Sequence, residues 1–228
     1  YYSINVLFYC SSIFALLSIA TILMRMQETL TKKETFKFSM LKISFRDVIN
    51  PQALPAFWIT LFGYLNYGVI ITLIPDWSEH LGFQNKGIFF VVYTVASVAV
   101  RFLGGKVSDQ YGRVPVMKCA IVLLGISMFL LGVMPSKGGM LFAGTLYGAA
   151  TGFFSPAISA FTIDVSDSDK RGKSVATMYI ALELSIGLGA FFAGWFFQDV
   201  MARVPYIFYG AGLVNLMGLV YLMQIKRK

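Results

Sequence analysis

Histidine, cysteine and acidic side chains are scarce in this chain, whose 228 residues include one histidine, two cysteines and 11 aspartates and glutamates. Both cysteines, Cys10 and Cys119, fall within apolar stretches, so we expect neither a disulfide framework nor a zinc site. The histidine, His80, lies beside Glu79 in a short polar segment. So few ligands cannot form the metal site of a membrane enzyme, and the sequence has no phosphate-binding loop. We therefore expect no metal, no cofactor and no catalytic residues.

Charged residues are also few, at 13% of the chain, whereas 57% of the residues are hydrophobic. Soluble domains carry about 25% charged residues, so the composition excludes that class. Windows of roughly 20 apolar residues recur with short polar interruptions, which is typical of helices that cross a bilayer. The net charge of +8 would indicate nucleic acid for a soluble protein. Here the basic residues collect in particular loops, so we expect a lipid bilayer and no nucleic acid as partner.

The apolar windows predict an all-α polytopic membrane protein with seven transmembrane helices. The expected spans are residues 1–24, 54–75, 87–103, 116–134, 140–163, 174–198 and 204–225. The chain then has three parts: a first helix over 1–24, a linker over 25–52 with charges of both signs, and a six-helix bundle over 53–228. The last six spans divide into two sets of three, as in membrane proteins built from inverted repeats.

Basic residues are distributed unevenly between the two sides of the expected bundle. Of the 19 lysines and arginines, only Lys86, Lys137 and Arg203 belong to loops on one side. The others belong to the linker, the polar stretch after the third span, the 164–173 loop and the basic tail. Positive residues favour the cytoplasmic side. We therefore expect an integral protein of the inner or plasma membrane, with residue 1 outside and the carboxyl terminus in the cytoplasm.

The sequence begins within an apolar stretch at Tyr1, without an initiator methionine or a basic segment. A secretory signal peptide has a basic start and a cleavage pattern, so none is expected here. An external first residue is explained by an odd number of upstream spans that this chain lacks. We therefore expect the carboxyl-terminal part of a longer protein with a missing amino-terminal half, in which five further spans would bring the total to twelve.

Residues 101–113, RFLGGKVSDQYGR, place four charges and three glycines between two long apolar stretches. Glycines let helix ends approach closely, and charges need water or a partner, so we predict a tight turn at the membrane face. A carboxylate there can accept hydrogen bonds from the amides at a facing helix N-terminus, worth about 0.3 to 1 kcal/mol. Asp109 could thus latch one helix bundle to another, held in place by Arg101 and Arg113. The alternative is that these charges only anchor the turn in water.

The segment GGKVSDQYGRVPVM resembles the G-x-x-x-D-x-x-G-R loop signature of the major facilitator superfamily of secondary transporters. Its fixed positions correspond in order to Gly105, Asp109, Gly112 and Arg113. In that family the signature occurs between helices two and three and, in weaker form, between helices eight and nine. The resemblance implies that the seven spans are helices 6 to 12 of a twelve-helix fold. It also implies that Gly105 lets a helix of the absent half approach.

Three further segments resemble this family. The approach FFVVYTVASVAVRFLGG is similar to an efflux-type branch, and GFFSPAISAFTIDVSDSDKRGKS resembles the tenth helix with its loop. The segment LELSIGLGAFFAGWFF resembles the eleventh helix of drug and sugar exporters, where an acidic residue precedes a glycine run. That acidic residue is Glu183 here. The glycines, Gly189 and Gly194, depart from the family spacing, so helix packing there is less defined.

Glu183 is the acidic residue that lies deepest within an expected span. At 1.5 Å per residue it is about 13 to 14 Å beyond Ser174, near the middle of a core roughly 30 Å thick. A carboxylate there needs protonation, a partner or a water-filled cavity. It is therefore either a proton-coupling or substrate-contact residue, or a permanently protonated glutamate bonded to a neighbouring helix. Arg101, two residues before the span end at Leu103, is expected close to the cytoplasmic face, which makes a direct pair with Glu183 marginal.

The resemblance implies that the spans over 54–75 and 140–163 supply one wall of a central cavity. The cavity candidates on them are Asn66, Tyr67, Tyr147 and Thr151. An asparagine in lipid surroundings must find a hydrogen-bond partner and should point inward. For the aromatic residues, packing is the competing interpretation. Glycines at 144, 148 and 152 share one helix face, which predicts close helix contact.

The sequence thus predicts part of a secondary active transporter, not an enzyme. It would move a small organic solute by alternating access in proton-coupled efflux. The alternative is a seven-helix receptor or retinal-type membrane protein, which also has an external start and seven spans. Against that alternative, the last span, 204–225, has no lysine to form a retinal Schiff base, and a long basic linker follows the first span.

Overall fold

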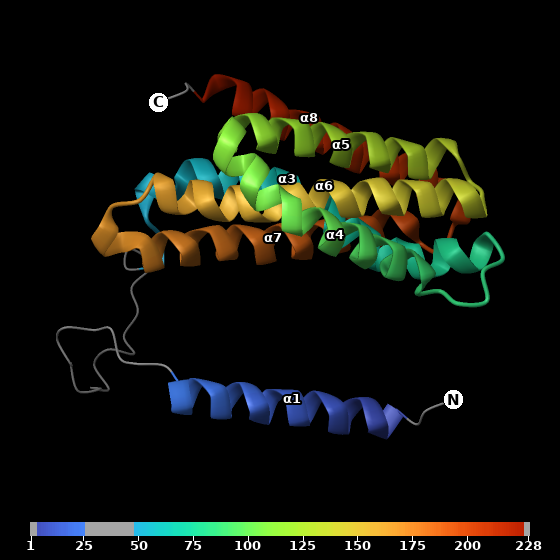
Figure 1. Ribbon diagram of the computed structural model, residues 1–228. Helices are drawn as coiled ribbons and strands as arrows, with labels where there is room; N and C mark the ends of the chain where they lie inside the picture. Colours follow the sequence, from blue (N-terminus) through green and yellow to red (C-terminus); the bar gives the residue numbers. More distant parts are fainter. Residues whose placement is uncertain (1–3, 26–47, 226–228) are drawn as a thin grey trace. The chain divides into compact units, whose positions relative to one another are not determined.

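The computed structural model describes residues 4–25 and 48–225, which form helices and loops without any strand. The long helices are α1 (Ile4–Arg25), α3 (Leu54–His80), α4 (Ile88–Tyr111), α5 (Arg113–Val133), α6 (Lys137–Asp164), α7 (Arg171–Phe197) and α8 (Val204–Gln224). Three short 3-10 helices are η2 (Pro51–Ala53), η3 (Ser168–Lys170) and η4 (Met201–Arg203). The chain divides into two units, residues 1–42 with α1 and residues 43–228 with the other helices (Figure 1). Most of the linker predicted over 25–52 lies outside the described residues.

Six helices of the described part are long and apolar enough, by length and composition, to cross a membrane. They are α1, α3, α5, α6, α7 and α8. The remaining long helix, α4, falls short because its apolar segment, Ile88–Phe102, is followed by Lys106 and Asp109. The predicted all-helical membrane fold is confirmed, with six helices rather than seven that meet both criteria.

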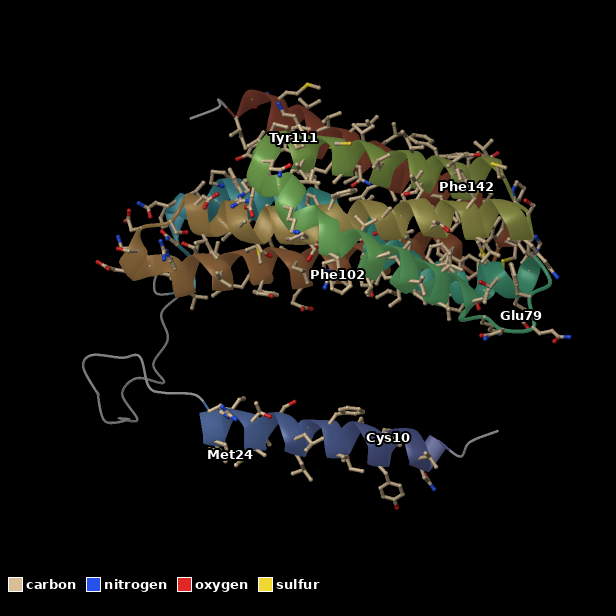
Figure 2. All side chains as sticks on the ribbon, viewed as in Figure 1. Cys10, Met24, Glu79, Phe102, Tyr111 and Phe142 are labelled. Carbon is tan, nitrogen blue, oxygen red and sulfur yellow. The ribbon has the colours of Figure 1, made fainter. Side chains whose placement is uncertain are left out.

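The predicted tight turn over residues 101–113 is wrong for most of its length. Helix α4 continues to Tyr111, labelled in Figure 2, and the chain reverses only at Gly112, whose φ is 88°. Glycine adopts such a positive φ without the steric cost that a Cβ imposes. The helix persists through the charged stretch because Val107 and Ser108 pack into the bundle. The charges therefore occupy the last turns of a helix.

The six helices of the second unit form two sets in chain order, α3 to α5 and α6 to α8, whose contacts correspond (Figure 1). Helix α3 lies against α7 and α8, and helix α6 lies against α4 and α5. Helices α5 and α8 also pack against each other. Exchanging α3 with α6, α4 with α7 and α5 with α8 maps these contacts onto one another. The correspondence of contacts between two sets of three helices is the pattern expected of inverted repeats.

Glycines bring the backbones of α4 and α6 into contact. A Cβ built on Gly148 would clash with the main-chain carbonyl of Tyr93. A Cβ on Gly152 would lie 2.8 Å from the carbonyl oxygen of Ser97. Small residues in this spacing allow membrane helices to approach closely. The packing role predicted for this glycine face is confirmed.

The related pair, α3 and α7, meets in the same way. A Cβ on Gly68 would clash with the main-chain carbonyl of Ile186, and a Cβ on Gly189 would clash with that of Leu65. The contact thus needs only one glycine from each helix. By contrast, a Cβ on Gly194 would meet no atom within 4 Å. Gly194 therefore makes no close helix contact, so its departure from the family spacing does not affect the packing of α7 against α3.

Buried Asn50 ties the entrance of the bundle to α7. Its side-chain oxygen accepts a hydrogen bond from the amide of Gln52 at 3.2 Å, which caps η2. Its Nδ2 donates to the hydroxyl of Ser174 at 2.6 Å, and its backbone N–H donates to the hydroxyl of Thr177 at 2.9 Å. The chain therefore enters α3 while attached to the first turns of α7.

Replacing Gly148 by leucine should lower the thermal stability of the purified protein in detergent. The new side chain would force α4 and α6 apart, at a cost of about 1–3 kcal/mol or more. Gly194→Leu is the matched control, because its Cβ enters open space, and it should leave the unfolding midpoint unchanged. Equal midpoints for the two variants would show that the α4/α6 contact is not a stabilising constraint.

Candidate functional site

One guanidinium, that of Arg113, joins the ends of three helices. It forms an ion pair with Asp109 of α4. Its Nε lies 3.3 Å from the Oδ2 of Asp164, the last residue of α6, and its Nη1 donates to the hydroxyl of Ser108 at 3.2 Å. A planar guanidinium suits this role because it presents several N–H donors in fixed directions. The ends of α4 and α6 are thus bound to the start of α5.

The carboxylate of Asp109 remains available to a further partner, because its side chain is 65% exposed. Arg101, which we expected to help hold this carboxylate, does not do so. It lies roughly 12 Å back along the axis of the same helix, and none of the ion pairs among the described residues includes it. Gly105 lies in the helical backbone between them.

The four cavity candidates lie together between α3, α4 and α6. The hydroxyl of Tyr147 donates to the Oδ1 of Asn66 at 3.0 Å, and both residues are buried. Thr151 turns its hydroxyl to its own helix, where it bonds to the carbonyl of Tyr147 at 3.1 Å. Tyr67 joins through Tyr93, whose ring centroid is 6.2 Å from that of Tyr67 and 5.7 Å from that of Tyr147. The candidates therefore form a packed polar cluster.

Tyr93 is central to this cluster, but our sequence analysis did not select it as a site residue. Its signal was present, because it is the only tyrosine of the apolar segment Ile88–Phe102. Asn215 of α8 was also missed. It is fully buried, and neither its side-chain oxygen nor its nitrogen has a hydrogen-bond partner among the described residues.

Asn66 also keeps an unused hydrogen-bond donor inside the bundle. Its Nδ2 is buried without a partner in the described part of the chain, while its Oδ1 is bonded to Tyr147. An unsatisfied buried donor costs about 1–3 kcal/mol. Such groups call for a specific explanation in a folded protein. The amide is therefore available to a water molecule or a solute.

Glu183 lies near the middle of α7 and is exposed. Its carboxylate forms no ion pair with any described residue. This placement argues against the alternative of a buried glutamate bonded to a neighbouring helix. Tyr179, one helical turn earlier, is exposed on the same side of α7.

Arg101 and Glu183 lie at similar depths, contrary to our expectation. The expected gap assumed a helix end at Leu103, but α4 continues to Tyr111, which places Arg101 about 15 Å from the helix end. Glu183 is about 18 Å from the start of α7. These ends lie on the same side of the bundle, because Arg113 bonds to Asp164 and η3 connects that residue to α7.

Tyr64 of α3 lies near Arg101 and near Tyr179, the neighbour of Glu183 on α7. Its phenol interacts electrostatically with Arg101 of α4 and with Tyr179 of α7, and it approaches the hydroxyl of Ser155 on α6. Four helices thus contribute to one surface, which we call the central polar surface and define by Tyr64, Arg101, Ser155, Tyr179 and Glu183. Charged side chains at this depth need water or protein rather than lipid around them.

Phe102 follows Arg101 on α4 and is 79% exposed (Figure 2). The surface around the arginine is therefore open within the described part of the chain. An exposed aromatic ring beside a cation is suited to contact with an organic solute or with another helix. The described residues thus present charge, hydroxyl groups and aromatic area together.

Comparison with known proteins relates this bundle to a family of transporters. The family model described as Major Facilitator Superfamily matches residues 56–228. The staphylopine export protein of Staphylococcus aureus is 25% identical over 201 residues, which are 86% of this chain and 51% of that protein. Multidrug resistance protein 1 of Bacillus subtilis is 23% identical over 150 residues, covering 65% of this chain and 38% of the relative. The chain spans about half the length, or less, of these curated relatives.

A solved structure shares the fold. The crystal structure of the human organic anion transporter MFSD10 (TETRAN) has a TM-score of 0.65 and 18% identity, and the match covers 76% of this chain and 47% of that one. The family match removes the alternative of a seven-helix receptor or retinal-type protein. Since the family model matches residues 56–228, from the first turn of α3 to the end of the chain, this chain belongs to the Major Facilitator Superfamily, a family of transporters and not of enzymes.

Proposed function

We propose that this chain is the carboxyl-terminal portion of a twelve-helix secondary active transporter, which moves a small organic solute by alternating access in proton-coupled efflux. Helix α1 is then the last helix of the amino-terminal bundle, and residues 53–228 form the carboxyl-terminal bundle, with α4 as its remaining span. The linker and the carboxyl terminus lie in the cytoplasm. The observation that carries the proposal is the central polar surface, with two exposed charges at similar depth in an apolar bundle.

The cost of charge in a bilayer favours a covered position for this surface. A charged residue at the middle of a spanning helix costs about 2.5–3.5 kcal/mol on insertion scales. Arg101 and Glu183 would both incur this cost if α4 and α7 turned them toward lipid. Facing them toward a missing amino-terminal half, across a water-filled pathway, removes it. Solute and protons then reach the same surface from one side of the membrane at a time.

Glu183 is suited to couple solute movement to protons. A carboxylate can bind either a proton or a cationic group of the solute, so each binding event weakens the other. Binding of solute from the cytoplasm releases the proton, and a proton from outside displaces the solute. This exchange is the minimum that proton-driven efflux requires.

The cluster around Arg113 acts as a cytoplasmic latch in this scheme. The exposed carboxylate of Asp109 accepts hydrogen bonds from the N-terminal amides of a helix in the amino-terminal half. Arg113 orients that carboxylate, and its second bond to Asp164 connects the latch to α6. Gly112 permits the reversal that places Arg113 there, and Gly105 leaves room on α4 for the facing helix. Separation of the halves on the cytoplasmic side breaks this contact.

Glu183→Gln should strongly reduce pH-gradient-driven export by the full-length protein in proteoliposomes, since a side-chain amide does not bind and release a proton as a carboxylate does. We expect at least about a tenfold loss of the gradient-dependent rate, equivalent to roughly 1.4 kcal/mol. The solute is one identified in a transport screen at two pH gradients. Glu79→Gln is the control, because Glu79 lies exposed in the last turn of α3, where it pairs with Lys86 at 2.6 Å. Unchanged gradient-driven export by the Glu183 variant would refute the coupling role.

Asp109→Asn should slow transport about two- to fivefold, because the latch is worth roughly 0.3 to 1 kcal/mol. Asp164→Asn keeps the carboxylate of Asp109 and removes only the ion pair between Asp164 and Arg113. Transport by this variant should therefore slow less. Transport rates at saturating solute, normalised to the amount of folded protein, measure both effects. An equal or larger loss for the Asp164 variant would contradict the latch assignment.

The chain of residues 1–228 should not transport by itself, because the opposite wall of the pathway and the partner of Asp109 belong to the other half. Vesicles containing only this chain should neither accumulate nor export the solute that the full-length protein moves. Addition of the amino-terminal half as a separate polypeptide should restore movement. Transport by the isolated chain would contradict the proposed division into halves.

A further inference from the structure

A cavity of about 510 Å³ lies between α3, α7 and α8, apart from the central polar surface. Its walls include the apolar side chains Leu65, Val69, Phe192, Phe196, Ile207 and Val214. Arg203, at the end of η4, is its charged lining residue. The volume falls within the range of small-molecule pockets, about 300–1,000 Å³.

The cavity opens away from the face of α7 that carries Glu183. Phe192 follows Glu183 by nine residues, which at 100° per residue places the two about half a turn apart around the helix. Phe192 and Phe196 are 47% and 58% exposed, so the cavity is open along its side. A solute at the central polar surface does not share this space. The occupant therefore comes from the surrounding bilayer.

The length of the cavity corresponds to one leaflet. Its lining residues run from Val214 back along α8 to Arg203, the residue just before the helix, a rise of roughly 16 Å. Half of a hydrocarbon core about 30 Å thick is about 15 Å. The cavity thus extends from the membrane interface to the bilayer centre, which is the reach of a single lipid chain.

The cation at the mouth of the cavity has only neutral partners among the described residues. Arg203 Nη1 donates to the side-chain oxygen of Gln198 at 2.6 Å and to the carbonyl of Phe196 at 3.4 Å. Asp199 lies in the same loop, but none of the ion pairs in the described part of the chain joins it to Arg203. Tyr206, also a lining residue, supplies a phenol at the interface. The mouth is therefore complementary to an anion.

We propose that this cavity binds one acyl chain of an anionic membrane lipid, with the lipid phosphate on Arg203. The apolar walls take the chain, and the guanidinium binds the phosphate with paired N–H donors. By the sidedness of the basic residues, the loop before α8 lies outside, so the lipid belongs to the outer leaflet. Its site is separate from the transport pathway and does not depend on the coupling mechanism.

Two pairs of variants separate the chain from the headgroup. Gly210→Phe fills the cavity, because Gly210 lines it and a Cβ there would meet no atom within 4 Å. Gly194→Phe is its control, with equally open space around the Cβ but outside the lining. Arg203→Gln removes the charge, and Arg203→Lys retains it. Thermal stability is measured for all four so that misfolded protein is not scored.

The protein is reconstituted in nanodiscs with equal amounts of phosphatidylglycerol and phosphatidylcholine of the same chain length, then released into mild detergent. Native mass spectrometry counts the lipid retained. The unchanged protein and Gly194→Phe should keep one phosphatidylglycerol. Arg203→Gln should lose about tenfold of its preference for it, as expected when a charged hydrogen bond is removed, and Arg203→Lys should keep most of that preference. Gly210→Phe should retain neither lipid.

Three results would overturn the proposal. Retention by Gly210→Phe at the level of the unchanged protein would exclude the cavity as the site. Equal retention of the two lipids by the unchanged protein, or a preference that survives in Arg203→Gln, would exclude recognition of the anionic headgroup. Retention of a compound that is not a lipid would exclude the proposed occupant.

Discussion

The close approach of helix backbones is the constraint on which the bundle depends. Gly148 on α6 and Gly189 on α7 each face a main-chain carbonyl of the neighbouring helix, Tyr93 and Leu65 respectively. In lipid, the hydrophobic effect does not drive apolar helices to associate. The van der Waals packing that the small helix separation permits provides the attraction instead. Two such pairs, α4 with α6 and α3 with α7, have corresponding contacts and position the remaining helices. The polar residues of the site lie on these pairs.

The position of the charges follows from this packing. Because α4 is held against α6, it continues past the apolar segment and carries its charged stretch as a helix. Arg101 then lies exposed about midway along the bundle, level with Glu183, while Asp109 reaches the helix end beside Arg113. A single helix therefore contributes to the central polar surface and to the cluster around Arg113. The central polar surface and the ion pairs of Arg113 are therefore joined by one continuous helix.

Helix number and sequence order were largely predictable, because apolar windows of membrane length leave a strong pattern. The signature residues Asp109 and Arg113 were also identified in advance, since their types and spacing are distinctive. Helix ends were harder: α3 continues to His80, and α4 passes Leu103, because tertiary packing rather than local composition decides where a polar stretch stays helical. Site residues such as Tyr93 are recognised by their contacts with segments far apart in sequence. The periodicity along one helix carries no information about such contacts.

The hydrogen bonds of Asn50 anchor the chain at the point where it enters the bundle. Its contacts with Ser174 and Thr177 fasten the start of α3 to the start of α7. A force applied to the chain before this residue is therefore shared by both helices instead of bending one of them. These are the helices that carry Tyr64 and Glu183. The chain at Asn50 is thus anchored to two helices of the bundle at once, and not to α3 alone.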